Sequence, residues 1–198
     1  MRYLIISLIA ILFDACTTVT PPKTEFRVNP HMPKIELVSN ECKSKSLKVA
    51  QAFSSNKLMS QDMNYALGDS KQYIYSESQW SVTPNKAITA RFLELLRETE
   101  LFNSVQVSKS RSRSDYILEI NIEDYMQYFN EDSSKSFATA TISLALIDTK
   151  TSITFATKTF RTKVDVNSLN AKGGVDALNI ALSNILSQSN AWLGKVCK

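Results

Sequence analysis

Histidine and glycine are scarce in this chain, which has one histidine and four glycines in 198 residues. The sequence has no Gly-x-Ser-x-Gly elbow, no His-Glu-x-x-His, no Cys-x-x-Cys pair and no glycine-rich nucleotide loop. The single histidine, His31, lies between two prolines in a segment without apolar periodicity, where it makes a poor general base or metal ligand. We therefore expect no catalytic residues, no metal site and no cofactor, and we expect that the protein is not an enzyme.

The chain also lacks a strong excess of positive or negative charge. The net charge of +4 and the isoelectric point near 8.9 favour weak attraction to anionic surfaces and do not call for a nucleic-acid partner. The one basic run, residues 109–114 (KSRSRS), could meet phosphate head groups or an acidic partner surface. More commonly, such a Ser/Arg stretch is a solvated loop between strands.

The first fifteen residues have the proportions of a targeting segment. An apolar run over residues 3–13 is too short for the roughly 20 residues that span a bilayer, and Cys16 follows it after a small residue. This is the arrangement of a bacterial lipoprotein signal, although Phe13 and Asp14 depart from the usual pattern. The alternative is an ordinary cleaved signal that contains a cysteine. We predict a lipoprotein signal peptide over residues 1–15 and lipidation of Cys16.

Lipidation of Cys16 would leave two further cysteines, Cys42 and Cys197. An exported protein folds in an oxidising compartment, so an even pair indicates a disulfide. The alternative is two unrelated free thiols.

Proline recurs between the signal and the first predicted strand, and few apolar residues occur there in any periodic order. This composition predicts a flexible periplasmic tether over residues 16–41. The folded domain is then expected over residues 42–198, which is enough chain for one well-buried core.

A helix is predicted over residues 84–99. Thr83 is expected to cap its amides and Pro84 suits its first turn, where the missing N–H is not needed. Asn103 is a plausible left-handed terminator. One face of the helix is apolar at helical spacing, formed by Ile88, Phe92, Leu95 and Leu96.

The remaining patterns predict a mainly antiparallel sheet. A strand is expected over residues 47–53, a hairpin around Gly68-Asp69, and a three-strand meander over 116–125, 137–147 and 153–166. A final helix begins near Val175, after glycines 173 and 174 relax the backbone. The sequence therefore predicts an α+β two-layer sandwich, with two helices packed on one face of a mixed, mainly antiparallel sheet.

The motif Tyr73-(x)6-Trp80-(x)3-Pro84, followed by a helix that ends in Leu-Phe102-x-x-Val, resembles the ABC-type transport auxiliary lipoproteins. A closing helix with a tryptophan near its end, here Trp192, is similar to that family as well. The resemblance implies a periplasm-facing partner of Mce-type lipid transport systems, with Mce-domain and permease subunits as partners and a possible homo-oligomeric ring. Thr17 stands where an aspartate retains many lipoproteins in the inner membrane, so by analogy we expect the outer membrane.

Three functional hypotheses remain open at this stage. The protein is an accessory subunit that docks on a lipid transporter, a module that binds lipid cargo itself, or an envelope lipoprotein with a structural or regulatory role. The candidate partner surface is aromatic and comprises Tyr125, Tyr128 and Phe129. Burial of these side chains under the final helix is the equally open alternative.

Overall fold

The computed structural model describes residues 21–34 and 41–197, so Cys16 and the predicted signal peptide lie outside the described residues. The strands are β1 (Thr24–Phe26), β2 (Ser46–Val49), β3 (Phe53–Ser54), β4 (Asp62–Leu67), β5 (Lys71–Trp80), β6 (Ser104–Val107), β7 (Tyr116–Phe129), β8 (Ser136–Asp148) and β9 (Ile153–Asp165). The helices are α2 (Pro84–Glu98) and α3 (Ala171–Val196), with short 3-10 turns η1 (Glu41–Ser44) and η2 (Asn56–Met59).

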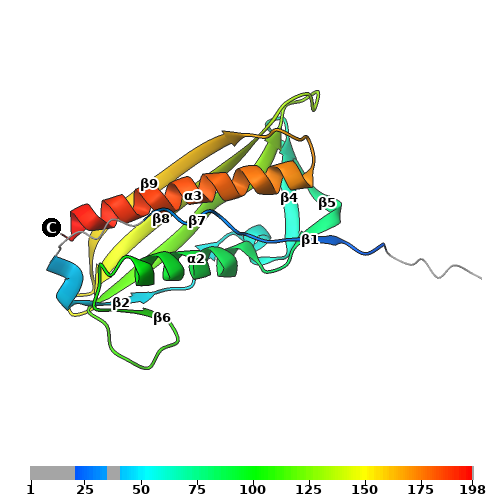
Figure 1. Ribbon diagram of the computed structural model, residues 1–198. Coiled ribbons are helices and arrows are strands. Elements are labelled where there is room, and N and C mark those ends of the chain that lie inside the picture. The colour runs from blue at the N-terminus through cyan, green and yellow to red at the C-terminus, as the bar shows by residue number, and fades with distance from the viewer. Residues whose placement is uncertain (1–20, 35–40, 198) are drawn as a thin grey trace, which may run out of the picture.

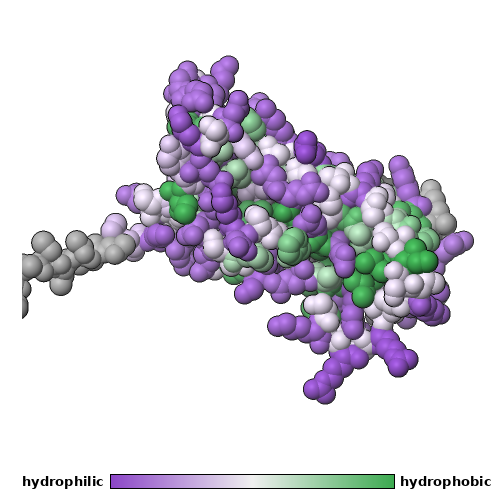
Figure 2. Space-filling model, turned by 180° about the vertical axis from the view of Figure 1, so that it is seen from behind, coloured by the Kyte–Doolittle hydropathy of each residue, from purple (hydrophilic) through white to green (hydrophobic). Residues whose placement is uncertain are grey.

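One sheet contains all the strands, and both helices cover the same face of it (Figure 1). The long ladders, β7 with β8 and β8 with β9, are antiparallel, and so is the β4–β5 hairpin. The short pairings of β2, β3 and β4 with β7 are parallel. The predicted α+β class with two helices on one face is therefore confirmed. The opposite face, seen in Figure 2, is largely hydrophilic, with hydrophobic residues gathered at one end.

The core lies between the sheet and the two helices. It joins the apolar face of α2 to the inward residues of the meander and to α3, which packs against β8 and β9. Its largest fully buried side chains include Leu47, Phe92, Leu96, Leu118, Ile142, Leu144, Leu182 and Ile185. The apolar side chains that recur at helical spacing and those that alternate along the strands are thus buried in the same core.

Both ends of α2 differ from the prediction. The Thr83 side chain makes no cap bond to the helix amides. Its hydroxyl donates to Asn85 Oδ1 at 2.7 Å, and its carbonyl accepts from the amides of Lys86 and Ala87. The left-handed residue after the helix is Glu100, with φ 49°, so Asn103 is not the terminator.

The start of α3 also corrects the prediction, because glycines 173 and 174 lie inside its first turn. Asn170 caps the helix by accepting from the Gly173 amide at 2.9 Å. A Cβ at Gly173 would lie 2.0 Å from the Ser168 carbonyl oxygen, and one at Gly174 would lie 1.9 Å from Gln127 Oε1. These glycines therefore allow close packing of the helix start, and they do not form a loop before it.

We expect Gly173→Ala to destabilise the fold by about 1–3 kcal/mol, because the facing backbone carbonyl cannot rotate away from the added methyl group. Gly194→Ala is the matched control in the same helix. Its Cβ would meet nothing within 4 Å, and the better helix propensity of alanine should stabilise by up to about 1 kcal/mol. Urea unfolding of both variants measures the difference. Equal unfolding midpoints for the two variants would contradict this account.

Part of the predicted tether packs against the domain, so residues 24–31 differ from the flexible segment expected there. Strand β1 pairs in parallel with the end of β5, placing Phe26 beside Trp80. Residues 27–31, which we call the strap, then run between α2 and α3 (Figure 1). Two strap residues, Val28 and Pro30, are buried.

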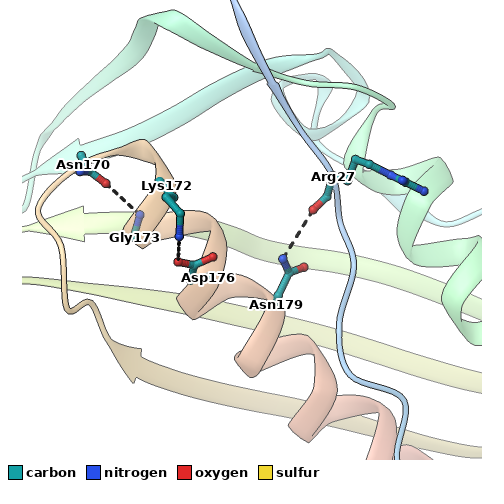
Figure 3. A network of polar contacts seen from close by, with 6 residues as sticks. All are labelled: Arg27, Asn170, Lys172, Gly173, Asp176 and Asn179. Atoms are coloured by element: carbon teal, nitrogen blue, oxygen red, sulfur yellow. Dashed lines mark hydrogen bonds and ion pairs between the residues drawn. The ribbon is translucent and has the colours of Figure 1, made fainter.

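Polar contacts hold the strap to α3. The Asn29 amide donates to Asn179 Oδ1 at 2.8 Å, and Asn179 Nδ2 donates to the Arg27 carbonyl at 3.5 Å. Figure 3 shows Asn179 on α3 reaching the strap, one to two turns beyond the Lys172–Asp176 ion pair on the same helix. Ser183 adds a hydrogen bond to the His31 carbonyl at 2.6 Å. The prolines alone predict an extended chain without tertiary contacts here. The contacts that order the strap use its backbone atoms, which leave no pattern in the sequence.

The predicted disulfide is present, with the Sγ atoms of Cys42 and Cys197 2.08 Å apart. The Glu41 amide also donates to the Cys197 carbonyl at 2.7 Å. Together these bonds join η1, just before β2, to the end of α3. They close nearly the whole domain into a loop.

Candidate functional site

A β-bulge in β7 decides which side chains reach the helix-free face of the sheet. The ladder with β8 shifts register between Ile122 and Asp124, so Glu123 is an extra residue. Before the bulge, Ile122 and its alternating neighbours face the core. After it, Asp124, Met126 and Tyr128 face away from the helices, while Tyr125, Gln127 and Phe129 are buried.

The aromatic partner surface proposed from the sequence is therefore divided. Tyr125 is 3% exposed and packs against Trp80, with ring centroids 5.9 Å apart. Phe129 is also buried, edge-on to Tyr65. Both are excluded from a free surface because the bulge turns them inward. Tyr128 alone of the three remains accessible.

Tyr128 lines a hollow of about 720 Å³ on the helix-free face. Its ring stacks on Phe137 of β8, with centroids 5.3 Å apart and an interplanar angle of 7°. Lys163 of β9 places its Nζ 3.6 Å above the centre of the Phe137 ring. Arg161, from the same strand, donates through Nε to Thr141 Oγ1 at 3.2 Å. We call this group of residues, with Asp124, the aromatic groove.

The aromatic groove carries both signs of charge. Arg161 and Lys163 come from the edge strand β9, and Glu123 and Asp124 come from the bulge in β7. The β4–β5 hairpin adds one charge of each sign to the lining, Asp69 and Lys71. Tyr128 donates its hydroxyl to Asp124 Oδ2 at 3.0 Å. Burial raises the pKa of Asp124 to about 6, against the lowering effects of the Tyr128 hydroxyl and of Arg161. The groove is suited to recognising a polar, aromatic or charged partner surface.

The raised pKa of Asp124 predicts a pH-dependent stability. The folded state holds this proton more tightly than the unfolded chain, so the destabilisation is absent below about pH 4 and is complete above about pH 6. We expect Asp124→Asn to be more stable than the wild type near neutral pH by on the order of 2 kcal/mol, allowing for partial exposure. The amide oxygen can still accept from Tyr128. Urea unfolding at about pH 4 and about pH 7 tests this, and an equal difference at both pH values would contradict it.

The other residues singled out from the sequence serve the fold in different ways. Trp80 is 3% exposed and Phe102 4% exposed, and Phe102 lies edge-on to Tyr116. Trp192 is half-buried, edge-on to Phe160. Tyr73 is 44% exposed and stacks on Tyr65. Pro84 is buried in the first turn of α2.

The sequence patterns did not identify the residues that complete the aromatic groove. Phe137, Arg161 and Lys163 lie on β8 and β9 and converge on Tyr128 only through the register of the meander. One signal was available: Glu123-Asp124 interrupts the alternation of β7 with two consecutive acidic residues, which indicates a bulge.

Two further structural findings concern metal binding and membrane crossing. Among residues 21–34 and 41–197, no group of three or more His, Cys, Asp or Glu side chains is arranged to hold a metal ion. Within the same described ranges, no helix has the length and apolarity needed to cross a membrane.

Known structures share this fold. A scan against protein-family models and a search of curated proteins each find no match. A crystal structure of a Xanthomonas campestris protein of the DUF330 family aligns with a TM-score of 0.76 at 16% identity, covering 87% of this chain and 96% of that one. A crystal structure of an uncharacterised protein aligns with a TM-score of 0.62 at 13% identity, covering 88% of this chain and 97% of the other. At these identities the likeness establishes the fold alone.

Proposed function

We propose that this protein is a lipid-anchored, periplasm-facing accessory subunit of an Mce-type ABC transport system that moves lipids between membranes. In this proposal it is held in the outer membrane through Cys16 and acts by docking on Mce-domain and permease subunits, without catalysis. The sequence motif around Trp80 and Pro84 supports the family assignment, and the aromatic groove supports the docking role.

The aromatic groove is the observation that carries the docking role. Protein interfaces favour tyrosine and arginine anchors in pockets that exclude water, and the groove offers Tyr128 and Arg161 around a stacked aromatic pair. Its opposed charges fix the orientation of a partner with complementary charges. The anchor brings the protein to the membrane, and the groove selects the subunit.

Affinity purification of the tagged protein from detergent-solubilised envelopes tests both parts. We expect Mce-domain and permease subunits to co-purify with the wild type. Arg161→Gln with Lys163→Gln should abolish this, since both exposed cations border the groove. Lys86→Gln with Lys158→Gln is the matched control, which removes two exposed cations outside the groove.

Each result has a defined meaning. Absence of transporter subunits from the wild-type sample would overturn the transport assignment. Co-purification of the groove variant at the wild-type level would overturn the docking face alone. Bound lipid in a wild-type sample that lacks transporter subunits would favour the alternative in which the protein carries lipid cargo itself.

The anchor has its own test. Cys16→Ser should release the protein into the soluble periplasmic fraction or leave it unprocessed at the inner membrane, because the serine cannot be lipidated. Envelope fractionation with immunoblotting measures this, and Lys86→Gln, an exposed substitution that leaves Cys16 and the disulfide in place, serves as the control. Normal processing with unchanged membrane retention of Cys16→Ser would contradict a lipid anchor.

A further inference from the structure

The end of the sheet remote from the aromatic groove has a second hollow, of about 640 Å³. Three segments far apart in the sequence line it: the start of β2, the end of the β6–β7 loop and the β8–β9 turn. Its charged side chains are Lys48, Arg113, Lys150 and Asp115. The basic run seen in the sequence thus contributes one arginine to a formed pocket.

Asp115 holds the three segments together. Its carboxylate accepts from the Ser46 amide at 2.9 Å and from the Ser46 hydroxyl at 2.8 Å. Its carbonyl accepts from the Thr149 amide at 2.9 Å and from the Thr149 hydroxyl at 3.0 Å. On the loop itself, Ser110 and Ser112 both donate to the Gln106 side chain. The frame of the pocket is therefore set by hydrogen bonds before any ligand arrives.

The pocket has an excess of positive charge. The Ser46 amide and hydroxyl hold the pKa of Asp115 below its usual range, so this carboxylate stays ionised and is satisfied by β2. Three cations face this one acid. Among the described residues, none of the three cations is within ion-pair distance of a carboxylate. A ligand with anionic oxygens, such as a phosphate group, would offset the excess positive charge of the pocket.

Apolar side chains adjoin the cations. Ile117 lines the hollow, and Ile147 of β8, its cross-strand partner on the same face of the sheet, is also partly exposed. Figure 2 shows hydrophobic residues gathered at one end of the helix-free face, above hydrophilic side chains that project from the same end. Cations beside exposed apolar groups match the chemistry of an anionic lipid, whose phosphate adjoins its acyl chains.

We propose that this pocket binds the phosphate group of an anionic phospholipid through Lys48, Arg113 and Lys150. The site does not depend on the transporter, because every group it needs lies on this chain. The same phosphate chemistry could come from a free phosphate, and the probes below distinguish the two sources.

Calorimetric titration of the full chain, purified in a neutral detergent, tests the site with three probes: dihexanoyl phosphatidylglycerol, dihexanoyl phosphatidylcholine and inorganic phosphate. We expect saturable binding of the phosphatidylglycerol and weaker binding of the other two. Lys48→Gln with Arg113→Gln and Lys150→Gln should weaken that binding by about tenfold or more, since hydrogen bonds to charged groups are the stronger class. Lys23→Gln with Lys86→Gln and Lys195→Gln, three exposed cations elsewhere, should change it by less than about threefold.

The remaining outcomes are also decisive. Equal affinity for phosphatidylglycerol and inorganic phosphate would keep the anion site and overturn the lipid source. No saturable binding of any probe, or equal loss in the two triple variants, would overturn the site. If the pocket triple variant unfolds, Lys150→Gln alone, in an exposed turn, should still weaken binding measurably. None of these results bears on co-purification of transporter subunits.

Discussion

Replacing Cys42 and Cys197 together with serine is expected to lower the free energy of unfolding by up to about 5 kcal/mol. The two cysteines are 155 positions apart, so the disulfide restricts almost the whole unfolded chain. The chain-entropy treatment gives its largest stabilisation for such long loops, and this value is its upper figure. Few single domains retain their fold after losing this share of a total near 5–15 kcal/mol.

Urea unfolding of the double variant, compared with the wild type with and without reductant, measures this effect. The reduced wild type should behave like the double variant, since both lack the bond but keep the other contacts of η1 and α3. We also expect the end of α3 to be the first part to exchange amide hydrogens in the double variant. Equal midpoints for the oxidised and reduced wild type would show that the bond adds nothing to stability.

Trp80→Ala is expected to destabilise the domain by about 3–5 kcal/mol. The Trp80 side chain is 3% exposed, against Tyr125, and its amide donates to the Gln61 carbonyl at 2.7 Å. Its Cα also pairs with Phe26 in the β1–β5 ladder. Truncation would therefore leave a cavity where β1, β5 and β7 meet.

Two controls separate this effect from general sensitivity. Trp192→Ala removes the same side chain from a half-buried position and should cost less than half as much. Pro84→Ala should change stability by no more than about 1 kcal/mol, the value of a proline that restricts the unfolded chain. Thermal and urea unfolding give the three values. A Trp80→Ala variant as stable as the wild type that no longer binds transporter subunits would instead assign this residue to a partner interface.

The elements with strong local periodicity were predictable. The apolar face of α2, the Gly68 hairpin and the alternation of β7 and β8 each carry their own signal, and the structure follows them. The disulfide followed from the expectation of an exported protein together with the cysteine count. These features depend on neighbours in the sequence or on chemistry that composition reveals.

The features set by distant contacts were not predictable. Strand β1 has no apolar alternation and exists because its backbone pairs with β5, more than fifty residues away. Glycines 173 and 174 are required because a Cβ at either position would clash with Ser168 or Gln127. Gln127 lies on β7, far from both glycines in the sequence. The aromatic groove needed the bulge at Glu123 and the register of three strands, so a search for aromatic clusters in the sequence found only Tyr128 of its members.

If Cys16 carries the proposed lipid, the pairing of β1 with β5 limits how far the domain can travel from the membrane. Because the sheet begins at Thr24, residues 17–23 are the entire spacer after Cys16. Even fully extended, that spacer reaches less than about 30 Å. With so short a spacer, a lipid-anchored domain would explore only a thin layer above the membrane, in which its local concentration is high and its orientation is restricted. Under that proposal its partners would have to extend to this layer, because the domain could not cross the periplasm to meet them.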